Sequence, residues 1–192
     1  LAAFLWAIDR LTTGAWPAGA LALVYVSPLK ALNQDVQRNL LQPLEEISSA
    51  LRAAGLVPPD VRVLTRSGDT PANERRRMVR TPPEILVTTP ESLNLLLLNP
   101  SGRRMLATAR CVILDEIHAV AANRRGTWLM TAVERLDRLC GGRLQRIALS
   151  ATVRPLDVVA AFVGGFERRT DGTLRPRPVR VVDPPAARRL EV

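Results

Sequence analysis

Two adjacent carboxylates and the only histidine of the chain follow directly after an apolar run. The run "CVIL" at 111–114 ends at Asp115 and Glu116, and His118 comes two positions later. A carboxylate at the end of a buried strand can hold Mg²⁺ beside nucleotide phosphates, and a neighbouring carboxylate can activate the attacking water. Asp115 suits the first role and Glu116 the second. The alternative is that Asp115 only caps the helix that begins with "EIHAVA".

Further polar side chains near this acid pair have both a chemical and a structural interpretation. A single histidine near a strand end, such as His118, is more often a hydrogen-bonded packing residue than a catalytic one. A metal site of His and Cys ligands is not expected, because no second cluster of such ligands is present. The stretch "LSAT" places Ser150, Ala151 and Thr152 after another apolar run. The two hydroxyls could bond across to carboxylates on a neighbouring strand end, or the stretch could form an ordinary turn.

The stretches "VSPLKAL" and "TTPESLN" share one pattern, a strand followed by a hydroxyl residue, a proline and a helix. Helix N-termini present unpaired N–H groups that favour phosphate, so two of them on one sheet could follow a nucleic-acid backbone. The candidate residues are Ser27, Pro28 and Lys30 in the first stretch and Thr89, Pro90 and Glu91 in the second. Lys30 strengthens the first site, whereas Glu91 disfavours an anion at the second. The alternative is two well-capped helices without a ligand.

A tight turn is predicted at "TRSGDTP", residues 65–71. Gly68 permits the turn, and Arg66, Asp69 and Thr70 are expected to be exposed around it. The basic run "ERRRMVR" that follows is expected to be a solvated helix face. As a lone loop, the turn indicates little about function.

Five short apolar runs predict the strands that position these residues. The runs lie at 21–26, 61–65, 84–88, 111–115 and 146–150. Because segments of helical periodicity alternate with them, the sequence predicts an α/β fold, a parallel sheet with helices on both faces. In such sheets ligands bind at the carboxyl ends of the strands, which is where the residues above are found.

The first of the predicted helices follows Ser27, with Pro28 at its first helical position. Pro43 is expected to interrupt it, and a second segment is expected to end at Gly55. Further helical stripes lie at 1–11, 90–98, 129–136 and 156–163.

Composition limits the class of protein. With 27 Lys+Arg against 18 Asp+Glu the net charge is +9, which favours polyanionic partners such as nucleic acid, although many basic proteins have no such partner. No apolar stretch approaches the ~20 residues that cross a bilayer, so we expect a cytoplasmic protein with no membrane partner. Cys111 and Cys140 are expected to be reduced structural thiols.

In this order, the motifs resemble those of superfamily 2 helicases of the DEAD/DEAH-like group, and most of all the large helicase-related (Lhr) family. "SPLKALNQD" resembles motif Ia, "TTPESL" motif Ib, "DEIH" motif II and "LSAT" motif III, with "RSGDTP" as the turn motif between the first two. The resemblance implies a RecA-like fold of the P-loop NTPase class, with ATP and Mg²⁺ as cofactors. It also implies ATP-driven movement along a single strand, with single-stranded DNA or an RNA–DNA duplex as partner.

The resemblance also assigns roles to individual residues. Asp115 would hold Mg²⁺, Glu116 would activate water, and His118 would couple the nucleotide cleft to a second RecA-like domain. Ser150 and Thr152, with Ala151 between them, would couple hydrolysis to strand movement. The residues implied along the nucleic-acid backbone are Ser27, Pro28, Lys30, Arg66, Gly68, Asp69, Thr70, Thr89, Pro90 and Glu91.

One family motif is missing from the sequence, because no G-x-x-x-x-G-K-[ST] phosphate loop occurs in it. We therefore expect residues 1–178 to be a partial first RecA-like domain without its N-terminal strand and phosphate loop. Residues 179–192 are expected to form an edge strand and a linker toward the second domain. The chain alone is then expected to be inactive. The alternatives are a non-catalytic nucleic-acid-binding remnant and a regulatory α/β domain whose acid pair is a cap.

Overall fold

The computed structural model describes residues 2–151 and 154–182 of the chain. Thr152 of "LSAT" and residues 183–192 of the expected linker lie outside these ranges. The chain forms two compact units, Leu1–Thr152 and Val153–Val192, which are described separately.

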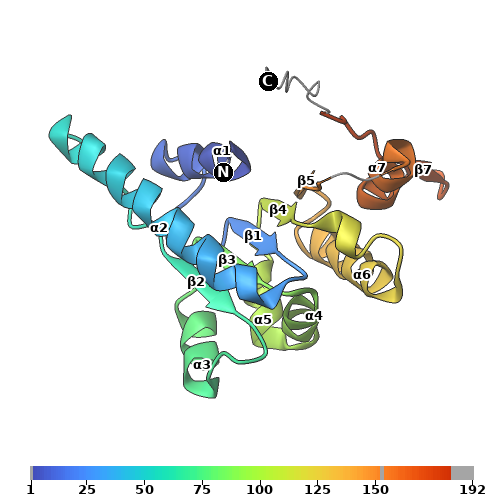
Figure 1. Ribbon diagram of the computed structural model, residues 1–192, viewed down its shortest axis with the longest axis horizontal. Coiled ribbons are helices and arrows are strands. Elements are labelled where there is room, and N and C mark those ends of the chain that lie inside the picture. Colours follow the sequence, from blue (N-terminus) through green and yellow to red (C-terminus); the bar gives the residue numbers. More distant parts are fainter. Residues whose placement is uncertain (1, 152–153, 183–192) are drawn as a thin grey trace, which may run out of the picture. The chain divides into compact units, whose positions relative to one another are not determined.

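The first unit is built on a sheet of five parallel strands (Figure 1). The strands are β1 (Leu23–Val26), β2 (Val63–Arg66), β3 (Ile85–Thr88), β4 (Cys111–Leu114) and β5 (Gln145–Ala148). Their spatial order is β2-β3-β1-β4-β5. Each strand begins and ends within two residues of its predicted range. The predicted α/β fold is confirmed, because near-continuous apolar runs are typical of strands buried on both faces.

Helices connect consecutive strands and form a layer on each face of the sheet. They are α1 (Ala2–Thr12), α2 (Lys30–Ala53), α3 (Ala72–Arg80), α4 (Pro90–Leu98), α5 (Pro100–Leu106) and α6 (Arg124–Leu139), with a short 3₁₀ helix η1 (Ile117–Ala119). α4 packs against both α5 and α6, and Figure 1 shows these three helices at a distance from α1; α2 packs against β2 and β3. In the described part of the chain, no helix combines the length and the apolar character needed to cross a membrane.

The core on the α1 and α2 side forms because alternate strand residues point to the same face. Leu23 and Tyr25 of β1 pack there with Phe4 and Ile8 of α1 and with Leu40 of α2. Each of these side chains is at most 6% exposed, and burying one large apolar side chain contributes about 1.5–3 kcal/mol. The same packing holds the inner strands in register beneath the two helices.

The predicted break at Pro43 is wrong, because α2 runs through it without interruption. A proline inside a helix costs about 3 kcal/mol, since its missing N–H and its ring disturb the preceding turn. Leu40 and Leu44, on either side of Pro43, are both buried in the core cluster, and Ile47 packs against it. The burial of this continuous apolar stripe offsets the local cost.

The predicted start of this helix is also wrong, because α2 begins at Lys30 with Leu29 at its N-cap position. Ser27 remains part of the sheet edge, since its N–H donates to the Thr88 carbonyl at 3.1 Å. Its buried hydroxyl instead accepts from the Leu29 N–H at 3.2 Å. Gly55 follows the helix with φ +75°, as its predicted role at the helix end requires.

The second unit contains α7 (Leu156–Gly164) and an antiparallel hairpin of β6 (Phe166–Arg168) and β7 (Leu174–Pro176). Gly165 follows α7 with φ +62°, in agreement with the predicted end of this helix. The edge strand expected around 179–182 is not observed, since those residues have no regular secondary structure. The strands that do form here, β6 and β7, pair with each other, and Asp171 stabilises their turn by accepting hydrogen bonds from the N–H and hydroxyl of Thr173.

Candidate active site and nucleic-acid interface

The carboxyl ends of the five strands lie in one row across the sheet. The row consists of Arg66, Thr88, Val26, Leu114 and Ala148, each the last residue of its strand. The residues that follow these strands therefore meet at one edge of the sheet. This is the edge at which open α/β sheets bind ligands.

The strand order divides the predicted site residues into two groups along this edge. β4 and β5 end at one side and carry Asp115, Glu116, His118 and Ser150. The other side carries the candidate nucleic-acid contacts, which follow β2, β3 and β1. β1 lies between the groups, paired with β3 on one side and β4 on the other.

The carboxylate of Asp115 is held by two donors. The hydroxyl of Tyr25 donates to Oδ2, and the Glu116 N–H donates to Oδ1 at 2.9 Å. The Asp115 N–H continues the sheet by donating to the Val26 carbonyl at 2.9 Å. The interpretation of Asp115 as a helix cap is not supported, because η1 has Glu116 at its N-cap position and lacks a side-chain cap.

Tyr25 is a site residue that sequence reasoning missed. Burial, the hydrogen bond to Asp115 and the nearby charges of Asp115 and Glu116 all raise the pKa of Tyr25 above its usual value of 10.0. The phenol consequently stays protonated and acts as a donor at neutral pH. A signal was present in the sequence, since this is the only tyrosine and it interrupts an apolar strand.

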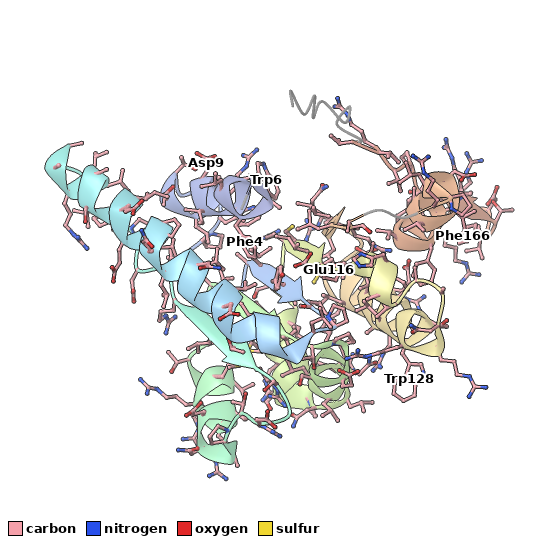
Figure 2. All side chains as sticks on the ribbon, viewed as in Figure 1. Phe4, Trp6, Asp9, Glu116, Trp128 and Phe166 are labelled. Atoms are coloured by element: carbon pink, nitrogen blue, oxygen red, sulfur yellow. The ribbon has the colours of Figure 1, made fainter. Side chains whose placement is uncertain are left out.

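Glu116 occupies a backbone conformation that side chains rarely adopt. It is the only non-glycine residue with a positive φ among the described residues, at φ 50° and ψ 41°. Hydrogen bonds on both sides hold it there, from its own N–H to Asp115 and from the Ile117 N–H to the Leu149 carbonyl at 3.1 Å. The turn leaves its side chain 31% exposed at the end of β4 (Figure 2). Such conformations cost roughly 1–3 kcal/mol and cluster at functional sites.

His118 bridges the acid pair and the "LSAT" stretch. Its Nε2 lies 3.2 Å from Oε2 of Glu116, and its Nδ1 lies 3.3 Å from Oγ of Ser150. The Ser150 hydroxyl thus contacts the turn after the neighbouring strand through His118, and not through a carboxylate as expected. Ala151 is exposed.

The chemistry of Asp115 and Glu116 suits a hard cation held jointly with phosphate. Mg²⁺ prefers oxygen ligands and is usually bound by one or two carboxylates together with substrate phosphates and water. In residues 2–151 and 154–182, no cluster of three or more His, Cys, Asp or Glu could hold a metal. The Asp115 carboxylate is of the type that could hold Mg²⁺ together with a nucleotide phosphate.

The turn that follows β2 is organised by its own side chains. The hydroxyl of Thr70 accepts from the Ser67 N–H at 2.9 Å, and the Arg75 side chain donates at 2.6 Å to both the Gly68 and the Thr70 carbonyl. Burial and the charge of Arg75 lower the pKa of Arg66. The predicted turn thus presents a half-buried arginine near a second guanidinium, which favours an anion.

The residues at the ends of β1 and β3 are less accessible than predicted. Ser27, Pro28, Thr89 and Pro90 are all buried. Thr89 caps α4, as predicted, by accepting from the Ser92 N–H at 3.3 Å, with Pro90 as the first helical residue. Lys30 begins α2 directly after this edge.

Glu91 has a partner that the sequence did not reveal. Nε of Arg125 lies 2.6 Å from its carboxylate, and both side chains are exposed. The hydrogen bond from Arg125 lowers the pKa of Glu91, and the same bond raises the pKa of Arg125. Arg125 thus offsets the negative charge that would disfavour phosphate at the start of α4.

A comparison with protein families agrees with this arrangement. Residues 1–159 match the family model described as DEAD/DEAH box helicase. The chain belongs to the DEAD/DEAH box helicase family. The match spans the whole edge of the sheet, from α1 to the residues after β5.

Curated relatives of this helicase-family chain are much longer than it is. It is 49% identical over 193 residues to the Lhr helicase/probable uracil glycosylase of Mycolicibacterium smegmatis. It is 47% identical over 199 residues to the Lhr helicase/uracil glycosylase of Escherichia coli. Each alignment covers 100% of this chain and 12% of the relative. The chain therefore spans about an eighth of the length of these relatives.

Solved helicase structures share the fold. The structure of Mycobacterium smegmatis helicase Lhr bound to ssDNA and AMP-PNP has a TM-score of 0.79 and 51% identity, and the match covers 86% of this chain and 21% of that one. The DEAD-box helicase Mss116 bound to ssRNA and UDP-BeF has a TM-score of 0.67 at 15% identity, with coverage of 82% and 31%. The predicted RecA-like fold is confirmed.

Proposed function

We propose that this chain is part of the motor of an Lhr-type, ATP-dependent helicase and belongs to its first RecA-like domain. The observation that carries the proposal is the continuous set of contacts Tyr25–Asp115–Glu116–His118–Ser150 at the carboxyl edge of the sheet. It supports a metal ligand at Asp115, a base at Glu116 and a relay at His118, all in the turn directly after β4. The relatives named as Lhr helicases support the same assignment.

In the proposed reaction, Asp115 holds the magnesium ion of Mg²⁺–ATP, and Glu116 orients and deprotonates the attacking water. The bound ion would supply charge neutralisation for the transferred phosphoryl group. The two carboxylates have different partners, since Oε2 of Glu116 lies 3.2 Å from Nε2 of His118 and Oδ2 of Asp115 accepts from Tyr25, so each can have its own role. The Glu116 N–H and the Tyr25 hydroxyl keep the Asp115 carboxylate oriented.

His118 would transmit the state of the nucleotide from Glu116 toward a second RecA-like domain. Its contacts with Glu116 and Ser150 support this role, because loss of the phosphate next to Glu116 would alter both. Ala151 and Thr152 would extend the connection, as the family resemblance implies. A histidine can donate or accept at either nitrogen, which suits a residue that changes partners.

The other side of the edge would contact the backbone of single-stranded DNA or of an RNA–DNA duplex. The partly or fully exposed residues Arg66, Gly68, Asp69 and Thr70 would make the contacts at the turn after β2, and Lys30 would contribute at the start of α2. The buried residues Ser27, Pro28, Thr89 and Pro90 would instead position the backbone N–H groups at the helix starts. The structure of a similar Lhr helicase with bound ssDNA supports this kind of partner.

A second candidate function is a nucleic-acid-binding module without catalysis. It is favoured by the absence of a G-x-x-x-x-G-K-[ST] motif from the 192 residues. For the same reason we propose that the isolated chain hydrolyses ATP no faster than buffer. Saturable ATPase activity of the purified 192-residue chain would contradict this statement.

The native-length protein tests the proposed function directly. We expect ATP hydrolysis to increase on addition of single-stranded DNA and a labelled strand to be displaced only when ATP is present. A binding module would retain the strand, with the log–log salt slope near −0.7 per phosphate contact, but would show neither activity. Protection of Lys30 from an amine-reactive reagent by DNA, read from the proteolytic peptide that contains Lys30, would report contact at the start of α2.

A further inference from the structure

The hydroxyl of Tyr25 is the one side-chain donor to Asp115 in the described part of the chain. Tyr25 belongs to β1 and not to any of the motifs that suggested the site. Its side chain is 1% exposed, and its hydroxyl is the polar end of an otherwise apolar strand, "LVYV". A tyrosine at this position can fill the core and also reach the carboxylate that follows the next strand.

The ring of Tyr25 is held firmly by its neighbours. In the sheet, Tyr25 lies between Val87 of β3 and Ile113 of β4. Phe4 of α1 packs on it with ring centroids 5.0 Å apart and an interplanar angle of 36°. Figure 2 shows Phe4 between α1 and β1. Because strands and helix together fix the ring, the position of the hydroxyl is fixed as well.

Two donors hold the Asp115 carboxylate from different directions. The Glu116 N–H occupies one lone pair of Oδ1, and the Tyr25 hydroxyl occupies one lone pair of Oδ2. A carboxylate has about four acceptor positions, so lone pairs remain for a cation. With one donor removed, the carboxylate could rotate about its Cβ–Cγ bond, because only the Glu116 N–H would restrain it.

We propose that Tyr25 is a positioning residue that orients the Asp115 carboxylate for Mg²⁺ in the nucleotide complex. The inference rests on the proposed function, since it assumes that Asp115 binds the ion. Hydrogen-bond partners of metal ligands typically contribute 10–100-fold to metal affinity. Tyr25 thus acts on the site through its hydroxyl, which donates to Oδ2 of Asp115.

The test compares Tyr25→Phe with wild type in the native-length protein. A fluorescent ATP analogue is titrated first without metal and then at increasing Mg²⁺ concentration. We expect Tyr25→Phe to need roughly 10-fold or more Mg²⁺ for half-maximal enhancement of nucleotide binding, because the ring stays but the donor is lost. Binding without metal and the melting temperature without nucleotide should stay close to wild type.

Phe4→Leu is the matched packing control. It removes the ring contact but keeps the Tyr25 hydroxyl, so its Mg²⁺ requirement should stay close to wild type even if the melting temperature falls. If Phe4→Leu and Tyr25→Phe raise the Mg²⁺ requirement equally, Tyr25 acts through packing and the inference is overturned. Tyr25→Met provides a second variant without a hydroxyl if Tyr25→Phe fails to fold.

The outcomes also separate this inference from the proposed function. If wild type binds nucleotide without any dependence on Mg²⁺, the proposed function itself fails. If wild type depends on Mg²⁺ and Asp115→Asn loses that dependence, the proposed function holds. An unchanged Mg²⁺ requirement of Tyr25→Phe in that case overturns only the role of Tyr25.

Discussion

Nδ1 of His118 lies 3.3 Å from Oγ of Ser150, across a separation of 32 residues in the sequence. The contact joins the turn after β4 to the turn after β5, two strands that pair directly in the sheet. His118 also reaches Glu116, so this one side chain contacts both the proposed base and the Ser150 hydroxyl. A movement of either turn would therefore alter the position of the other turn, because His118 contacts both.

Replacing His118 or Ser150 by alanine should uncouple hydrolysis from strand movement. We expect His118→Ala to keep nucleotide binding and to lose about tenfold in strand displacement per ATP hydrolysed, because Asp115 and Glu116 remain. Strand displacement per ATP hydrolysed should be no lower in the His118→Ala/Ser150→Ala double variant than in His118→Ala, because the effects of substituting two residues in contact do not add. Strand displacement and ATP hydrolysis measured in parallel check this, and fully additive effects would contradict a shared pathway.

Arg125 should support nucleic-acid binding by neutralising Glu91. Arg125→Gln leaves the Glu91 carboxylate unpaired at the start of α4, so affinity for single-stranded DNA should fall about fivefold at low salt. The double variant Arg125→Gln with Glu91→Gln should regain most of that loss. Arg124→Gln removes the same charge from the adjacent position and serves as the control in fluorescence anisotropy. Equal losses in both single variants would show that only net charge matters.

Glu84 should make the amino end of the sheet sensitive to acid. Burial opposes its charge, but the hydrogen bonds from Arg62 and Gly19 prevail and lower the pKa of Glu84 below 4.5. The ionised Glu84 carboxylate therefore stabilises the folded state fully above its unfolded-state pKa of 4.5. This stabilisation is lost as the pH falls through the lower pKa that Glu84 has in the folded state. Because Glu84 is 1% exposed, we expect Glu84→Gln to cost about 2 kcal/mol near neutral pH.

Hydrogen exchange of the β1 and β3 amides measures this contribution within the intact protein. The difference in amide protection between wild type and Glu84→Gln should be present at about pH 6 and should shrink toward about pH 3. An equal difference in protection at both pH values would mean that the ionisation of Glu84 does not contribute to the stability of the folded state.

Gly126 should not tolerate a side chain. A Cβ atom at this position would lie 2.1 Å from the Val120 carbonyl oxygen, so the start of α6 would have to move away from the turn that follows η1. We expect Gly126→Ala to destabilise the domain by about 1–3 kcal/mol, the usual cost of overpacking. Gly68→Ala is the control, because its Cβ would meet nothing within 4 Å. Equal melting temperatures for the two variants would contradict the prediction.

The strands could be predicted because each lies in a short apolar run, and the three inner strands β1, β3 and β4 are buried along their whole length. Thr89 and Pro90 were predictable for a similar reason, since a capping hydroxyl followed by proline acts locally. The continuation of α2 through Pro43 could not be predicted from the sequence. It depends on the burial of Leu40 and Leu44, and that burial depends on the sheet on which the helix packs.

The site could be predicted only as far as its residues are adjacent in sequence. Asp115, Glu116 and His118 were found because they share one turn. The donor from Tyr25 lies 90 residues away, and Arg125 lies 34 residues from Glu91. Such contacts depend on strand order and helix packing, which local patterns do not specify. The burial of Ser27 and Thr89 has the same origin, since it results from the neighbouring strands and helices.

The replacement Glu116→Gln tests the central claim, that the carboxyl edge at β4 hydrolyses ATP. In the native-length protein with single-stranded DNA, ATP turnover should fall by a factor on the order of 10² to 10⁴, because the base is lost. Nucleotide affinity measured on the same preparation should be retained, since Asp115 still binds the ion and glutamine keeps the shape of the side chain. Turnover equal to wild type would contradict the account and would leave the acid pair without a catalytic role.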